Sequence, residues 1–401
     1  MTCLMPEPTE PTKTVPPVQS ARVTADATRL AELTTIGVGG APQQIIRAES
    51  EAELIAAIRS ADDAGLPLLV LGGGSNILAA DADFPGVVIR DERQEITTLD
   101  VSGCGGAELR ATAGTPWDEV VVYAIENGWM GVEALSGIPG SVGAAPVQNI
   151  GAYGQELAET FAMARVYDRE RQRTDSLFLS DMKFGYRDSI LKRSMRAELP
   201  DAGDATPKQW TPSPRWIVLD VTLQMRLATL SRPVRYAQLA AKLDIEPGER
   251  APSAEVRAAV LELRRSKGMV LDDADADTFS LGSFFTNPVL TEAAAANLPP
   301  EAPRFAVTDG AAVNQIGAAA PKVAGQVKTS AAWLISNAGF AAGYGMPGPA
   351  ALSTKHSLAI TNRGTATAAD IAQLARTVRD GVLEKFGVRL VPEPVLVGLE
   401  I

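Results

Sequence analysis

The sequence predicts an α+β fold divided into several domains. A strand, a helix and a second strand follow one another between Gln43 and Leu71, in the order that α/β units use. Longer strand patterns at 161–168 and 215–227 are separated by loops and followed by further helices. The length of 401 residues is that of two or three domains, and a hydrophobic content of 46% is enough to bury their cores.

Capping and breaking residues mark the first elements. The pattern at 43–48 predicts a strand, and Ser50 with Glu53 forms a capping box that opens a helix ended by Gly65. The apolar run 67–71 predicts a buried parallel strand. The later strands that the pattern predicts are 87–90, 108–114, 161–168, 215–227 and 388–398, and the later helices are 116–127, 253–265, 328–339 and 367–387.

Charge and composition exclude several classes of function. The net charge of −11 disfavours nucleic acid or an anionic membrane as the main partner. No run approaches the roughly 18 apolar residues that a membrane helix needs. The two cysteines, Cys3 and Cys104, make no disulfide framework, so we expect a reducing, cytoplasmic setting. Residues 1–25 begin with an acidic, Pro-rich stretch that has no apolar core, so we expect a disordered tail and no signal peptide.

His356 is the only histidine of the chain. A single histidine disfavours metal sites built on histidine clusters, and we expect no metal. It equally disfavours Ser-His-Asp triads. Proton transfer is therefore expected to use Ser, Tyr, Lys, Cys or a carboxylate, or to be carried by a cofactor, and His356 is expected to be structural.

Two glycine-rich segments are candidates for phosphate binding. The strand 67–71 ends abruptly in the turn GGGSN at 72–76, where α/β folds often bind ligands, although no helix clearly follows. The second segment, 137–154, holds five glycines, two prolines and no charged side chain. Backbone N–H groups in such turns form concave anion sites. A plain hairpin at 72–76 and a buried turn without ligand at 137–154 are the alternatives.

Three further residues could carry chemistry, each with a structural alternative. Arg187 in GYRDS could bind a carboxylate or phosphate, or pair with Asp188. Ser283 could donate a proton beside the aromatic pair that follows it, or cap a strand end. Glu393 lies between two prolines, which keep it out of an ordinary strand ladder, and is either a surface residue or a positioned acid.

Taken together, several segments resemble the UDP-N-acetylenolpyruvoylglucosamine reductase (MurB) family. They occur in the family's order and cover most of the chain from about residue 28, which is more specific than any one of them. The segments are TTIGVGGAP (34–42), LGGGSN (71–76), SGIPGSVGAAPVQNIGAYGQE (136–156), FGYRDSILK (184–192), GSFFTNP (282–288), KTSAAWLISNAGF (328–340) and PEPVLVG (392–398).

The resemblance implies three domains, two of which form an FAD-binding fold of the PCMH/vanillyl-alcohol-oxidase type, and a smaller α+β substrate domain. The implied boundaries are 26–90 with 388–401, 91–264, and 265–387. It implies non-covalent FAD, NADPH as co-substrate, and UDP-N-acetylmuramate dehydrogenase activity in peptidoglycan synthesis. The enolpyruvyl group of UDP-N-acetylglucosamine-enolpyruvate would receive hydride at C3 from flavin N5 and a proton at C2. We further expect a monomer.

The resemblance also assigns residues. FAD would be contacted by Gly72, Gly73, Gly74, Ser75, Asn76, Ile138, Pro139, Gly140, Ser141, Val142 and Gly143. The catalytic residues would be Arg187, Ser283 and Glu393, and the substrate contacts Lys267, Asn287 and Lys328. Arg187 and Glu393 would stabilise the charge that develops on the substrate, and Ser283 would protonate C2.

The sequence departs from the family pattern at two points, and two other functions are alternatives to the reductase. Some relatives have a substrate-clamping tyrosine after GYRDS, and the corresponding region 197–214 offers only Trp210, with Trp216 just beyond it. Ser283 follows Lys267 by sixteen positions, a longer spacing than in the shortest relatives. An oxidase of the same fold is one rival, and its flavin would often be attached through His or Cys. A non-catalytic nucleotide-sugar sensor is the other rival.

Overall fold

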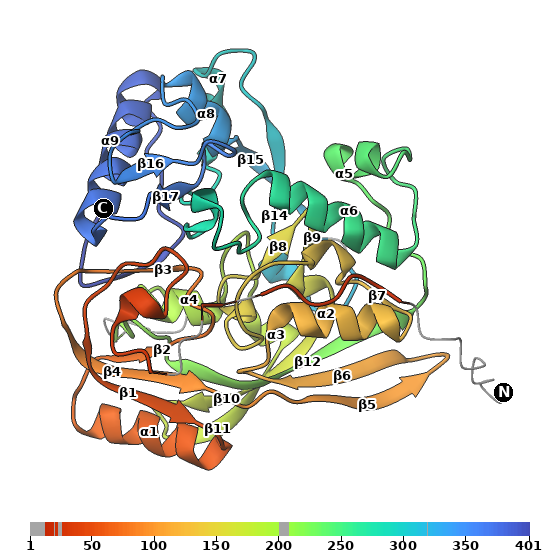
Figure 1. Cartoon of the computed structure of the whole chain (residues 1–401). Coiled ribbons are helices and arrows are strands. Elements are labelled where there is room, and N and C mark those ends of the chain that lie inside the picture. The colour runs from red at the N-terminus through yellow and green to blue at the C-terminus, as the bar shows by residue number, and fades with distance from the viewer. Residues whose placement is uncertain (1–12, 20, 23–25, 200–207, 319) are drawn as a thin grey trace.

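The computed structural model describes residues 13–19, 21–22, 26–199, 208–318 and 320–401. Helices and strands are interspersed along this part of the chain, which confirms the α+β class. Figure 1 shows two stacked groups of elements: the long strands with α1 and α2 lie below, and the C-terminal helices, coloured blue, lie above them. No helix in the described ranges is long and apolar enough to cross a membrane.

A small parallel sheet positions the first glycine-rich turn. β1 (Pro42–Ala48) and β2 (Leu68–Val70) both pair in parallel with β4 (Phe84–Asp91), which lies between them. α1 (Glu51–Asp63) connects β1 to β2 and buries Leu54 and Ile58 against this sheet. The predicted capping box is present, because Ser50 Oγ accepts a hydrogen bond from the Glu53 N–H. The chain therefore leaves β2 directly into residues 72–76.

The C-terminal segment returns to this turn. β18 (Val395–Val397) pairs in parallel with β3 (Ile77–Ala79), and the Val395 N–H donates to Asn76 O at 2.9 Å. The predicted strand 388–398 is therefore wrong in its first half. Residues 388–394 run outside any named strand because Pro392 and Pro394 have no N–H to donate.

The large sheet is antiparallel. Its order is β11–β10–β12–β6–β5, and β7 (Trp129–Met130) pairs with the end of β12. α2 (Trp117–Glu126) covers one face of the sheet, where Val120 and Val121 are fully buried. The strands are β5 (Ile96–Ser102), β6 (Gly106–Thr112), β10 (Phe161–Asp168), β11 (Arg173–Phe178) and β12 (Trp216–Leu227). β5 and β11 are missing from the prediction because their exposed faces are polar.

Short elements connect the sheet to the cavity described below. They are the 3₁₀ turns Glu133–Leu135, Ala145–Val147 and Leu157–Glu159, the strands β8 (Gly151–Ala152) and β9 (Gln155–Glu156), and the helices α3 (Leu179–Met182), α4 (Ile190–Met195), α5 (Ala237–Lys242) and α6 (Ser253–Ser266). α6 lies above α2 in Figure 1.

The C-terminal elements have their own core. α8 (Ala331–Asn337) and α9 (Ala368–Phe386) bury Leu334, Ile371 and Val378 in it. The predicted helix 328–339 begins three residues late, because Lys328 ends a strand and Ser330 Oγ caps the helix. The other elements are β13 (Val289–Thr291), α7 (Glu292–Ala296), β14 (Phe305–Thr308), β15 (Lys322–Lys328), β16 (Ala350–Leu352) and β17 (Ile360–Asn362).

Part of the N-terminal region differs from the expected disorder. Residues 13–19 lie across α2 and are held by hydrogen bonds to Asp118 and Arg257. The predicted tail 1–25 therefore includes an ordered stretch, while residues 1–12, 20 and 23–25 lie outside the described residues.

Candidate active site

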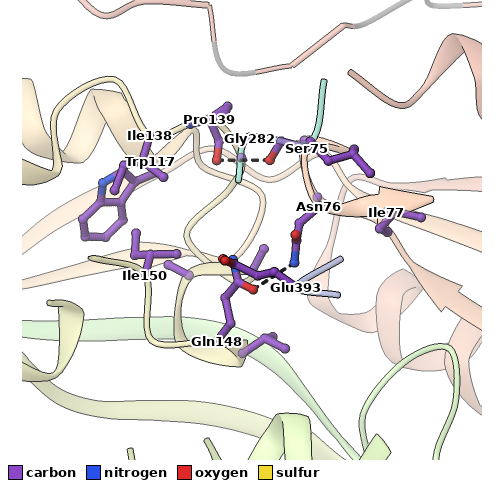
Figure 2. A pocket seen from close by; sticks show the side chains of 18 of the residues that line it. Ser75, Asn76, Ile77, Trp117, Ile138, Pro139, Gln148, Ile150, Gly282 and Glu393 are labelled. Atoms are coloured by element: carbon purple, nitrogen blue, oxygen red, sulfur yellow. Dashed lines mark hydrogen bonds between the residues drawn. The ribbon is translucent and has the colours of Figure 1, made fainter. Parts of the chain in front are cut away.

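A cavity of about 520 Å³ lies between the two groups of elements. Its wall includes the glycine-rich turn 72–76, most of the segment 138–145, and the stretch 280–283 from the C-terminal group. Figure 2 shows Ser75 and Asn76 on one side of the space, with Glu393 and Gln148 facing them. Segments far apart in the sequence thus form one site, and its volume falls in the range of ligand pockets.

The turn 72–76 presents free backbone donors. No acceptor is recorded for the five N–H groups of residues 72–76 within the described part of the chain. Gly74 has φ +65°, and a Cβ there would overlap the carbonyl oxygen of Leu33. A run of unpaired N–H groups at the end of a parallel strand is suited to a phosphate group. The plain-hairpin alternative leaves these donors unexplained.

Side-chain hydrogen bonds join the two glycine-rich segments. Ser75 Oγ donates to Pro139 O at 3.3 Å, and Asn76 Nδ2 donates to Gln148 Oε1 at 2.9 Å (Figure 2). A Cβ on Gly72 would come within 2.6 Å of Ser141 Oγ, so the absence of a side chain permits this approach. The two segments therefore form one continuous wall.

Val142 is the one residue of 138–143 that does not line the cavity. Its side chain is 2% exposed and packs in the core under α2, so it does not line the cavity. The N–H groups of Val142 and Gly143 donate to Thr115 O and Ala113 O. These two hydrogen bonds fix Val142 and Gly143 to the turn that follows β6. Within 138–143, only Gly140 and Ser141 have N–H groups without a recorded acceptor among the described residues. The side chain of Val142 therefore does not line the cavity, and the expected contact of Val142 with FAD stays a prediction.

Arg264, which the sequence reasoning missed, lines the cavity near this segment. Its Nε donates to Gly137 O at 3.1 Å and its Nη2 to Met269 O at 2.9 Å. Burial lowers the pKa of Arg264 from its usual value. The sequence feature that could have identified Arg264 is its position in the last turn of α6, three residues before the predicted substrate residue Lys267. The cavity therefore has a buried cation beside a segment without charged side chains.

Arg187 and Glu393 form an ion pair at the cavity wall. Arg187 Nε lies 3.2 Å from Glu393 Oε1, and Arg187 Nη2 donates to Gly151 O at 2.6 Å. The backbone at Arg187 has φ +54°. Asp188 pairs instead with Arg193 and Arg196, so the alternative of a local Arg187–Asp188 pair is wrong.

Ser283 lies between buried aromatic residues and the cavity. It follows Gly282, which has φ +69°, and precedes Phe284, which is fully buried. The Glu393 N–H donates to Phe284 O at 2.9 Å, so adjacent backbone segments hold Ser283 and Glu393. Both residues line the cavity, and no protein partner is recorded for Ser283 Oγ in the described ranges. Its hydroxyl is available to a bound molecule.

The three expected substrate residues are placed differently. Lys267 lines the cavity, donates to Gln238 Oε1 at 2.8 Å, and has its pKa lowered by burial and by nearby Arg264. Asn287 also lines the cavity, and its Oδ1 caps α8 by accepting from the Ala331 N–H. Lys328 is outside the lining residues, with its Nζ 4.3 Å from the ring centroid of Tyr186.

Tyr236 and His356 are further cavity residues that sequence reasoning did not place there. Tyr236, the residue before α5, packs edge-on against Tyr153 with 5.4 Å between ring centroids and is 44% exposed. Trp210 is 4% exposed, its ring faces Arg169, and it does not line the cavity, whereas Trp216, Tyr153 and Tyr236 do. Burial lowers the pKa of His356 to about 4, so this imidazole is neutral near pH 7.

The residues present fit FAD. Free N–H groups at 72–76 and at Gly140 and Ser141, with Arg264 beside them, suit a diphosphate, and the apolar side chains of Ile138 and Ile150 suit a flat ring system. Cys104 lies at the β5–β6 turn and is not a cavity residue, so it offers no covalent attachment there. Among the described residues no group of His, Cys, Asp and Glu side chains could hold a metal ion.

Comparisons with known proteins agree with this geometry. The model "FAD binding domain" matches residues 42–170, and the model "UDP-N-acetylenolpyruvoylglucosamine reductase, C-terminal domain" matches residues 274–397. The crystal structure of the Thermus caldophilus reductase has the same fold, with a TM-score of 0.57, 24% identity, and coverage of 92% of this chain and 97% of that chain.

Curated relatives match nearly the whole chain. UDP-N-acetylenolpyruvoylglucosamine reductase of Cutibacterium acnes is 47% identical over 93% of this chain and 90% of its own length. The enzyme of that name from Thermobifida fusca is 46% identical over 92% of this chain and 97% of its own length. The chain therefore belongs to the UDP-N-acetylenolpyruvoylglucosamine reductase family.

Proposed function

We propose that this protein reduces the enolpyruvyl group of UDP-N-acetylglucosamine-enolpyruvate to give UDP-N-acetylmuramate, with FAD as cofactor and NADPH as reductant. The observation that carries the proposal is the meeting of two N–H-rich segments with Arg187, Ser283 and Glu393 around one cavity. The N–H groups of the two segments are suited to bind a diphosphate cofactor. The three side chains are suited to stabilise charge and donate a proton at an enolpyruvyl group.

The cofactor-binding residues are 72–76 with Ile138, Pro139, Gly140, Ser141 and Gly143. The N–H groups of 72–76, Gly140 and Ser141 would bind the pyrophosphate, and Arg264 would add the positive charge that the two segments themselves lack. FAD held there would supply the hydride chemistry that links NADPH to C3 of the enolpyruvyl group. We propose non-covalent binding: Cys104 lies outside the cavity lining, and acid release of the flavin tests whether His356, which lines the cavity, is attached to it.

Arg187 acts on the substrate carboxylate. Addition of hydride at C3 moves negative charge onto C2 and the carboxylate, and a fixed guanidinium stabilises this charge more strongly in the transition state than in the substrate. Gly151 O and Glu393 Oε1 hold Arg187 in place before the substrate binds, so little reorganisation is needed. Glu393 is therefore a partner that orients Arg187 as well as a group facing the substrate.

Ser283 protonates C2. Its hydroxyl has no recorded protein partner in the described ranges and faces the same cavity as Arg187 and Glu393. A serine hydroxyl is a weak acid in water. The alkoxide that forms would be stabilised by positively charged side chains that line the same cavity, among them Arg187 and Lys267.

Lys267 and Asn287 bind the UDP portion, and Lys328 contributes charge through its contact with Tyr186. Tyr236 covers the substrate, because its ring stands half-exposed at the cavity wall beside Tyr153. We place the domains at 26–90 with 388–401, 91–264 and 265–387, a division supported by the pairing of β18 with β3. We also propose a cytoplasmic monomer that serves cell-wall synthesis, and through it cell shape and division.

The test is an absorption spectrum of the purified protein followed by two additions. Yellow flavin absorbance is expected to bleach with NADPH and to return on anaerobic addition of UDP-N-acetylglucosamine-enolpyruvate. Release of the flavin by acid precipitation identifies non-covalent binding. Absence of a flavin band, or bleached flavin that the enolpyruvyl substrate leaves reduced, contradicts the proposal. Bleaching of the flavin by a simple alcohol or hydroxy acid, with return of the colour on admission of O2, would favour the rival oxidase.

A further inference from the structure

We propose that residues 13–19, here called the N-terminal strap, position the cofactor segment 137–143 through Asp118, and so determine how firmly the protein holds its cofactor. This inference rests on the proposed function, since it takes FAD as the bound molecule. Figure 1 shows the strap, in red, running across α2. Asp118 is a positioning residue in this scheme, because it lies outside the cavity lining.

The strap completes a buried ion pair. Arg257 on α6 and Asp118 on α2 face each other with two hydrogen bonds, of 2.7 and 2.8 Å, and both side chains are 0% exposed. Arg257 Nε donates to Val15 O and Arg257 Nη2 to Pro16 O, each at 2.7 Å. The Val18 N–H donates to Asp118 Oδ2 at 2.8 Å. Buried charges need such additional hydrogen bonds to offset their desolvation.

The same carboxylate holds the start of the cofactor segment. Asp118 Oδ1 accepts from the Gly137 N–H at 2.6 Å, while Gly137 O accepts from Arg264 Nε at 3.1 Å. Gly137 has φ +68°, and a Cβ there would lie 2.6 Å from Leu261 Cδ2. The N–H and the carbonyl oxygen of Gly137 are therefore both hydrogen-bonded, the first to Asp118 and the second to Arg264. A displacement of Asp118 would therefore displace Gly137 and, with it, the start of the segment 138–143.

The chain beyond the strap reaches the opposite wall of the cavity. The Arg22 guanidinium stacks on the Phe279 ring at 3.4 Å and lies 3.2 Å from Asp273 Oδ1. Phe279 directly precedes the cavity stretch 280–283. The N-terminal region therefore contacts Asp118, which binds Gly137, and Phe279, which precedes the cavity stretch 280–283. It is connected in this way to two separate parts of the cavity lining.

The experiment measures FAD release from the full-length holoprotein. Val18→Pro removes the N–H that binds Asp118, and Val18→Ala keeps it, so the two variants form a matched pair. After dilution, protein-bound flavin is followed over time by gel filtration. We expect release from Val18→Pro to be about tenfold faster than from Val18→Ala, which should match the parent. Deletion of residues 1–12 should leave the rate unchanged, and deletion of 1–19 should raise it.

Two controls separate positioning from loss of stability. Val378→Ala opens a cavity in the C-terminal core, so it should lower the unfolding temperature without speeding release. A peptide of residues 13–22 added to the 1–19 deletion should slow release again. Equal release rates for Val18→Pro and Val18→Ala, with flavin bound in the parent, overturn the inference alone. A parent protein that holds no flavin overturns the proposed function instead.

Discussion

Arg187 and Glu393 form an ion pair across the cavity wall, with 3.2 Å between Arg187 Nε and Glu393 Oε1. The pair joins the turn before α4 to the segment before β18, two parts of the chain that only the folded state brings together. The Lys192 Nζ donates to Glu393 O at 3.3 Å and adds a second tie between them. The geometry of the catalytic cation therefore depends on the C-terminal segment.

Arg187→Lys should lower kcat/KM for the enolpyruvyl substrate by about 10²–10³-fold. Lysine keeps the charge but has one donor atom in place of the fork that binds Gly151 O and Glu393 together. Steady-state kinetics with NADPH measure the effect. The matched control is Arg193→Lys, which changes a pair with Asp188 outside the cavity lining. A loss of similar size in both variants would contradict the assigned role of Arg187.

Ser283→Ala should separate the two half-reactions. NADPH should still bleach the flavin, because this step needs no proton from the serine, whereas reoxidation by the enolpyruvyl substrate should slow by about 10²–10⁴-fold. Stopped-flow absorbance of the flavin measures both rates. Ser266→Ala, an exposed serine at the end of α6, is the control. Normal rates in both half-reactions of the Ser283 variant would remove the serine from the mechanism.

Gly74→Ala should lose most of its bound FAD, whereas Gly65→Ala should keep it. Both glycines have φ +65°, so both substitutions carry similar backbone strain of about 1 kcal/mol. A Cβ at Gly74 meets the Leu33 carbonyl, while nothing lies within 4 Å of a Cβ at Gly65. The ratio of flavin to protein absorbance and the unfolding temperature distinguish them. Equal flavin content in the two variants would mean that the turn 72–76 tolerates displacement.

His356 should make stability depend on pH between about 4 and 6.5. Its pKa is about 4 in the folded protein and about 6.5 when unfolded, so the unfolded state binds more protons in this window. The contribution is fully present above pH 6.5 and is lost as the pH falls towards 4, by at most about 3 kcal/mol.

Urea unfolding of the parent and of His356→Gln at several pH values measures this contribution. The variant should lack this part of the pH dependence. Because the chain has one histidine, its imidazole NMR signals need no assignment and give the pKa directly. A titration midpoint near 6.5 in the folded protein would contradict the buried, neutral imidazole.

Local sequence signals predicted the local structure well. The capping box at Ser50 and Glu53, the apolar run that became β2, and the C-terminal Gly387 of α9 are each confirmed. These features depend on hydrogen bonds and side-chain contacts within a few residues. β5 and β11 were missed although each pairs with the strand next to it in the chain, because their exposed polar residues hide the apolar alternation.

The candidate site was predicted in part. Motif resemblance identified Arg187, Ser283 and Glu393, and all three line the cavity. Arg264 in α6, Tyr236 before α5 and His356 in the β16–β17 loop were not placed there, because only the folded chain brings these segments to the cavity. Val142 was assigned to the cavity because a motif does not tell which residues of a turn point inward.

The sequence by itself determined the family and the two glycine-rich segments, because these depend on residue type and order. Only the tertiary structure decided which cation faces the cofactor segment, which carboxylate holds Arg187, and that residues 13–19 lie on the Asp118–Arg257 pair. Those contacts join residues distant in the chain. Their free energy comes from burial and hydrogen bonding that exist only once the elements have packed.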